Sequence, residues 1–210
     1  MKKKNYIFTS ESKEIKWLMK KDKKLAYLIK NIGTLKYSLD ENYFVFLVNT
    51  IIGQMLSNKA SSAISSRLFV LCNNSITPQN IINLSVEKLR EIGISTAKSK
   101  YIMNLSNHIL NYPDFFMDFQ DMDDDSAIEE IKKLNGLGSW SAKMFLIFVL
   151  NRMDILPYED VAFLQSFKWL YSTDDISKDN IIKTCLPWKP FSSIASRYLY
   201  IALDNGYTKG

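Results

Sequence analysis

The sequence predicts an all-α fold, and three observations support this prediction. Apolar residues recur at intervals of three and four along nearly the whole chain, whereas the alternating pattern of a half-buried strand is almost absent. The 210 residues include only seven glycines and five prolines, so few positions interrupt a helix. With 47% hydrophobic residues, the chain can bury a substantial core in one large domain or in two small lobes.

The helical periodicity divides the chain into successive segments. Apolar residues predict a first helix within residues 15–29, a largely buried second helix over about 44–56 and a third over 60–71. Shorter helices are expected after Pro78 and after Ser85, whose side chain can cap the helix that follows it. The remaining helices are expected over approximately residues 97–111, 126–133, 139–151, 160–171, 177–184 and 190–205.

These helices are expected to form two lobes with an active-site cleft between them. The two ends of the chain, residues 1–41 and 135–210, are expected to form one lobe. Residues 42–134 make up a helical bundle in themselves and are expected to form the other lobe. The chain has no internal repeat and no low-complexity linker.

The charge distribution is uneven. The chain has 27 basic and 22 acidic residues, and a net charge of +5 favours nucleic acid only weakly. Residues 1–40 are strongly basic, with eleven lysines against four carboxylates. Residues 118–130 are strongly acidic, and we interpret this run as a solvated face.

Cysteine and histidine are scarce. Cys72 and Cys185 lie far apart, which excludes a four-thiolate iron–sulfur cluster and a cysteine-rich zinc site and indicates a reducing compartment. The single histidine, His108, lies in an ordinary helix and is expected to be structural or solvated. The chain has no recognisable signal peptide or membrane span, so a cytoplasmic, nucleoid-associated or otherwise intracellular protein is expected.

The most informative segment runs from Leu134 to Asp160. Gly136 and Gly138 free the backbone where the chain must turn tightly, and Leu134 and Leu137 can pack the turn together. The residues that follow open a helix whose N–H groups and positive dipole end suit a phosphate. A phosphate cradle followed by Asp160 at the start of the next helix indicates chemistry on a nucleic acid.

Five segments resemble the helix-hairpin-helix superfamily of DNA glycosylases, and within it the DNA-3-methyladenine glycosylase II branch. In chain order they are KDKKLAYLIKNIG, ENYFVFLVNTIIGQMLSNKASSAISSRL, LREIGISTAKSKYIMNLS, LNGLGSWSAKMFLIFVLNRMDILPYED and WKPFSSIASRYLYIAL. The resemblance covers nearly the whole chain and implies two helical lobes, without the large N-terminal α/β domain of some members. It implies a repair enzyme that flips an alkylated purine of the 3-methyladenine type out of duplex DNA and hydrolyses its N-glycosidic bond, leaving an abasic site.

The resemblance assigns catalysis to Asp160. Departure of the base leaves positive charge on the sugar, which an adjacent carboxylate stabilises, and the same carboxylate can orient or deprotonate the attacking water. An aspartate that begins a helix is ordinarily only an N-cap. The two roles are compatible, because a helix N-terminus favours the charged carboxylate.

Trp140 bears on strand cleavage. Bifunctional relatives carry a lysine at this position, and its amine attacks the sugar. The tryptophan therefore predicts a monofunctional enzyme without lyase activity. Lys143, three residues further on, is expected to face a phosphate or the solvent.

Further site residues are implied by the resemblance. Gln54 and Met55 lie where relatives carry a loop that enters the minor groove, and Met55 suits an apolar wedge, although a core methionine at a helix end is the alternative. The expected DNA contacts are Gln54, Met55, Gly136, Gly138, Ser139, Lys143 and Lys189. The expected base pocket comprises Trp140 and Tyr200, with Phe44, Tyr158 and Trp188 as further candidates, because aromatic faces attract an electron-poor base.

The resemblance also implies which cofactors and partners the protein uses. The backbone carbonyls of Leu134 and Leu137 are expected to hold a monovalent cation at the hairpin, and no organic cofactor or iron–sulfur cluster is expected. The protein is expected to act as a monomer on double-stranded DNA that contains damaged bases. A glycosylase for oxidised or mismatched bases and a non-catalytic binder of damaged DNA are the two alternatives.

Overall fold

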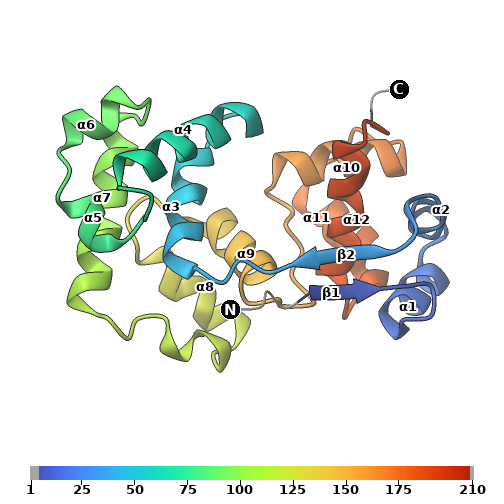
Figure 1. Cartoon of the computed structure of the whole chain (residues 1–210). Coiled ribbons are helices and arrows are strands. Elements are labelled where there is room, and N and C mark those ends of the chain that lie inside the picture. Colours follow the sequence, from blue (N-terminus) through green and yellow to red (C-terminus); the bar gives the residue numbers. More distant parts are fainter. Residues whose placement is uncertain (1–4, 209–210) are drawn as a thin grey trace. The chain divides into compact units, whose positions relative to one another are not determined.

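The computed structural model describes residues 5–208, and within this range the all-α prediction is confirmed (Figure 1). Twelve α-helices and two 3-10 helices are accompanied by a single two-stranded sheet in the described residues. Residues 1–4, which contain three of the N-terminal lysines, lie outside that range. No helix between residues 5 and 208 is both long enough and apolar enough to span a membrane.

The chain divides into two compact units. We call the first the terminal unit, because it combines the chain up to residue 39 with the chain from residue 151 onward, and the second, residues 40–150, the central unit. The sequence places the later boundary at residue 134 instead, and it assigns the hairpin to the terminal unit. The structure differs because α9 (Ser139–Phe148) packs against α8 (Asp124–Lys132) and α3 (Tyr43–Gly53) of the central unit.

The first half of the terminal unit contains the sheet. Strand β1 (Asn5–Phe8) pairs antiparallel with β2 (Leu35–Ser38), and α1 (Lys13–Lys21) and α2 (Lys23–Ile32) connect them. Strands of four residues are too short to show a clear alternating pattern, so the sequence did not predict them. The single helix predicted within residues 15–29 is broken at Asp22, whose side chain accepts a hydrogen bond from the backbone N–H of Leu25 and caps α2.

The second half of the terminal unit is helical. It contains α10 (Val161–Tyr171), α11 (Lys178–Cys185), the 3-10 helix η2 (Leu186–Trp188) and α12 (Ser192–Asp204). Helix α12 packs against both α10 and α2, so segments from the two ends of the chain share one core.

The central unit begins with α3 and ends with α9. Between them lie α4 (Asn58–Leu71), α5 (Pro78–Ile82), α6 (Val86–Glu91), α7 (Thr96–Asn111), the 3-10 helix η1 (Met117–Gln120) and α8. The side chain of Ser85 accepts a hydrogen bond from the backbone N–H of Lys88, as its predicted capping role requires. The core centres on Phe145 of α9, whose ring meets those of Tyr43 and Phe119 with centroids 5.4 and 5.6 Å apart.

Candidate functional site

The hairpin lies between α8 and α9 in the central unit. Leu134 and Leu137 are both buried, and the N–H of Leu137 donates to the carbonyl of Leu134 at 3.1 Å. Gly136 has a φ of +85°, and a Cβ there would lie 2.3 Å from Cδ2 of Tyr101. Glycine is therefore required at this position both by the backbone conformation and by the close approach of a ring.

The exposed residue Gly138 forms the entry to α9. It is the N-cap of that helix, and its carbonyl accepts the N–H of Ala142 at 3.0 Å. Ser139 and Trp140 form the first turn and are half-buried. The predicted combination of a tight turn and a helix N-terminus is thus present, and its backbone N–H groups suit an anion. Lys143, which was also predicted to contact DNA from this helix, is buried, with only 7% of its surface exposed. It is therefore not solvated.

The loop between α3 and α4 presents Met55. Its side chain is fully exposed and its φ is +59°, so it is not a core methionine. Gln54, predicted to contact DNA, instead donates from Nε2 to the carbonyl of Gly136 at 2.8 Å. This bond ties the Met55 loop to the hairpin.

Lys98 holds the other side of this loop. Its Nζ donates to the carbonyls of Ile52 and Gln54 at 2.9 and 2.6 Å, and burial lowers the pKa of Lys98. This role of Lys98 was not predicted from the sequence. One signal was present: a lysine in the first turn of α7 opposes the helix dipole, which is unfavourable unless carbonyl partners compensate.

Replacing Lys98 with methionine should weaken the Met55 loop. The change keeps an unbranched stem but leaves two partly buried carbonyls without their charged donor, so we expect a loss of about 1–3 kcal/mol in the free energy of unfolding. Urea denaturation measures this loss, and DNA affinity should fall with it. Lys100→Met, on an exposed position of the same helix, is the matched control. Equal losses in the two variants would contradict a role for Lys98 in holding the loop.

Asp160 lies in the terminal unit and begins α10. Its Oδ1 accepts the N–H of Phe163 at 2.8 Å, and only 9% of its surface is exposed. The predicted N-cap is therefore confirmed. Tyr200 of α12 lies beside it: burial and the carboxylate of Asp160 raise the pKa of Tyr200 well above its ordinary value. The phenol therefore stays protonated and can donate toward the carboxylate.

A buried cation adjoins this pair. Arg197 lies three residues before Tyr200, on the same face of α12, and its Cζ lies 3.6 Å from the ring centroid of Tyr37. The hydroxyl of Tyr37 donates to Oδ1 of Asn151 at 2.9 Å. Burial lowers the pKa of Arg197, while the neighbouring Tyr37 and Tyr200 act in the opposite direction. No pattern in the sequence links these residues.

Two of the aromatic residues predicted for the base pocket are buried. Trp188 is completely buried, packs edge-on against Phe163 and donates from Nε1 to Oδ2 of Asp22 at 2.9 Å, so it is a core residue. Phe44 is also buried, on α3.

Two predicted site residues of the terminal unit are more accessible. Tyr158 is half-buried, with Nζ of Lys178 lying 5.1 Å from its ring centroid. Lys189 is exposed and its Nζ lies 4.0 Å from Oδ2 of Asp154.

Comparisons with known proteins agree with this arrangement. The family model "HhH-GPD superfamily base excision DNA repair protein" matches residues 48–190. A crystal structure of a DNA-3-methyladenine glycosidase from Bacillus halodurans is 31% identical, with a TM-score of 0.82 over 97% of this chain and 96% of that one. The alkylbase DNA glycosidase-like protein mag2 of Schizosaccharomyces pombe is 28% identical over 186 residues, which are 85% of this chain and 87% of mag2.

A further solved structure shares the fold. The 3-methyladenine DNA glycosylase Mag1 of Schizosaccharomyces pombe, solved in complex with abasic DNA, has a TM-score of 0.84 at 23% identity, over 92% of this chain and 97% of that one. The matched family model covers the Met55 loop, the hairpin and Asp160. The chain belongs to the HhH-GPD superfamily of base excision DNA repair proteins.

Proposed function

We propose that the protein is a DNA glycosylase that hydrolyses the N-glycosidic bond of alkylated purines of the 3-methyladenine type. The observation that carries this proposal is the nearly buried Asp160, fixed at the start of α10 beside Tyr200. The names of the similar glycosidases support the same activity and the same class of base.

The proposed chemistry needs one carboxylate and water. As the base leaves, positive charge builds up on the sugar, and the fixed negative charge of Asp160 stabilises it. The hydrogen bond from the N–H of Phe163 holds one carboxylate oxygen in place, so the carboxylate need not reorganise during the reaction. An alkylated purine that was cationic leaves as a neutral base, and water then adds to the sugar and gives up one proton to the carboxylate, so the product is an abasic site.

The absence of a nucleophilic amine at position 140 supports hydrolysis without strand cleavage. A tryptophan cannot form a Schiff base with the sugar. Lys143 is buried on α9, which does not suit a nucleophile that must reach the sugar. Borohydride should therefore trap no covalent complex with DNA that contains an abasic site.

DNA binding is proposed to use two elements of the central unit. The exposed Met55 would act as the wedge that fills the space of the flipped base. The hairpin would hold a phosphate, aided by a monovalent cation on the carbonyls of Leu134 and Leu137. Neutral carbonyl oxygens suit such a cation, and the carbonyl of Leu134 keeps a second lone pair beyond its bond to Leu137. We propose that the protein acts on damaged double-stranded DNA as a monomer.

One observation favours the alternative of oxidised or mismatched bases. The buried guanidinium of Arg197 near Tyr200 would stabilise a base that departs as an anion, whereas a 3-alkylated purine is already cationic. The two substrate classes therefore predict different released bases.

Base release from methylated duplex DNA tests the proposal. The freed bases are separated chromatographically, and release of 3-methyladenine is expected. Duplexes with oxidised, deaminated or mismatched bases are assayed in parallel. Release only from those duplexes would replace alkylated purines as the substrate class. No release from any duplex, with DNA binding retained, would instead support a non-catalytic binder.

A further inference from the structure

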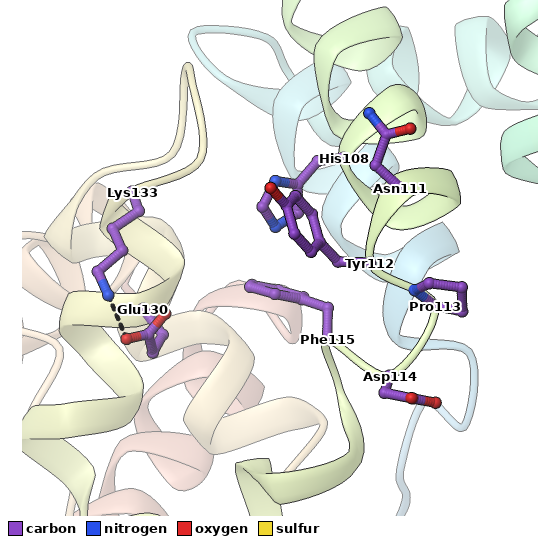
Figure 2. Close-up of a pocket in the computed structure, with 8 residues that line it drawn as sticks. All are labelled: His108, Asn111, Tyr112, Pro113, Asp114, Phe115, Glu130 and Lys133. Atoms are coloured by element: carbon purple, nitrogen blue, oxygen red, sulfur yellow. Dashed lines mark hydrogen bonds and ion pairs between the residues drawn. The ribbon is translucent and has the colours of Figure 1, made fainter.

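A pocket that contains none of the predicted site residues lies wholly within the central unit. It has a volume of about 490 Å³ and is formed by the end of α7, the loop that follows α7, and the end of α8 (Figure 2). The lining residues are His108, Asn111, Tyr112, Pro113, Asp114, Phe115, Glu130 and Lys133. None of them takes part in the proposed glycosylase chemistry.

Aromatic rings form one wall of this pocket. The centroid of the His108 ring lies 4.9 Å from that of Tyr112 and 4.7 Å from that of Phe115, and the Phe115 ring is edge-on to His108. Phe115 is itself backed by the fully buried Phe119, with centroids 5.3 Å apart. Backbone hydrogen bonds from the N–H of Tyr112 to His108 and from the N–H of Phe115 to Tyr112 fix the turn. The wall is therefore held in place before any ligand arrives.

Polar groups surround this wall. Asp114 and Glu130 contribute carboxylates, and Lys133 forms an ion pair with one oxygen of Glu130 (Figure 2). The Nε2 atom of His108 is enclosed and has no hydrogen-bond partner among the described residues. The pocket thus offers ring faces, the carboxylate of Asp114 and the carboxylate of Glu130, one oxygen of which is paired with Lys133.

The surroundings of the pocket are acidic. Residues 118–130 carry seven carboxylates and no lysine or arginine, in a protein whose net charge is +5. Such a face repels DNA phosphates and attracts a cationic partner, since complementary charge raises association rates and excludes wrong partners. Most of the acidic run is exposed, as expected of a solvated face, and its last residue, Glu130, lines the pocket.

We propose that this pocket is a docking site for an arginine side chain in a basic segment of a partner protein. A guanidinium is planar, stacks on aromatic faces and binds carboxylates. This chemistry matches the rings of Tyr112 and Phe115 and the carboxylates of Asp114 and Glu130, which line the same pocket. Lysines beside the arginine would lie against the acidic run of residues 118–130.

The single histidine makes the proposal directly testable. The ring signals of His108 in a ¹H–¹³C spectrum need no assignment, because the chain has one histidine. The probe is an acetylated, amidated peptide of sequence Gly-Lys-Lys-Arg-Lys-Lys-Gly, titrated into the full chain. We expect a saturable shift of the His108 signals, and a matched peptide with lysine in place of arginine should bind about tenfold more weakly.

Three variants distinguish binding of the peptide in the pocket from its non-specific attraction to the acidic residues 118–130. Glu130→Gln and Tyr112→Ala should each weaken peptide binding about tenfold, whereas Asp121→Asn removes one acidic charge outside the lining and should change it less than about twofold. Base release should be unchanged in all three variants, which shows that they fold. Equal affinity for the lysine peptide, or equal effects of Asp121→Asn and Glu130→Gln, would overturn the proposal. N-acetylarginine amide binding as tightly as the peptide would indicate a small-molecule site and would also overturn it.

Discussion

Replacing Asp160 with asparagine is expected to lower the rate of base release at least about a hundredfold, because removal of one preorganised electrostatic group commonly has an effect of this size. Asparagine caps helices about as well as aspartate, so the hydrogen bond from Phe163 and the start of α10 should persist. Single-turnover base release from methylated duplex DNA measures the rate. DNA affinity should stay within about tenfold, since the change removes a charge from the proposed reaction centre and not from the hairpin.

Asp160→Ala separates capping from catalysis. This variant loses both the charge and the cap, so it should lose base release and also about 1 kcal/mol of stability. Asp160→Asn should retain the melting temperature of the wild type. A carboxamide at position 160 that released base at the wild-type rate would show that this carboxylate is only an N-cap, and the proposed function would lose its central observation.

Replacing Gly136 with alanine is expected to disrupt the hairpin. An alanine there would be held at a φ of +85° and would place its Cβ 2.3 Å from Cδ2 of Tyr101. The backbone strain and the collision together should lower the free energy of unfolding by about 3 kcal/mol. The hydrogen bond from Gln54 to the Gly136 carbonyl would be displaced as well, so DNA affinity should fall. Urea denaturation and fluorescence anisotropy with a duplex measure the two effects.

Gly138→Ala is the matched control for that change. No atom lies within 4 Å of a Cβ built at Gly138, and its φ of −108° is open to any residue. Its loss of stability should stay within about 1 kcal/mol, the value of a poorer N-cap. Adding Tyr101→Ala to Gly136→Ala should recover part of the stability by removing the collision. Equal losses for the two single glycine variants would contradict the requirement for glycine at position 136.

The features that the sequence predicted correctly are mostly local. The hairpin needs a glycine at position 136, between two packed leucines, and the cap needs an aspartate three residues before Phe163. Each feature can be recognised within a short stretch of chain, although the sequence does not show that Gly138, unlike Gly136, has no need to be glycine. The contact between Arg197 and Tyr37 joins residues that are far apart in sequence. Neither residue type indicates from the sequence which residue it will contact. The same is true of Lys98, whose carbonyl partners lie 44 and 46 positions earlier.

Two predictions were wrong because they depended on tertiary packing, which the sequence does not show. Trp188 has the residue type expected of a base pocket, but its indole N–H is directed to Asp22 from the other end of the chain. The hairpin helix α9 was assigned to the wrong unit because the sequence of an apolar helix does not indicate which other helices it packs against. Residue type indicates what a side chain can do, whereas its partners depend on contacts between distant parts of the chain.

The bond between Gln54 and the Gly136 carbonyl has a consequence for searching along DNA. This bond joins the Met55 loop to the hairpin, and Lys98 joins the same loop to α7 of the same compact unit. The distance from the proposed wedge to the proposed phosphate anchor is therefore expected to stay constant. A duplex held by a given phosphate would therefore be probed at one fixed base step. To inspect the next base pair, the protein would have to release that phosphate and take hold of the adjacent one, so that its search would proceed in single-nucleotide steps.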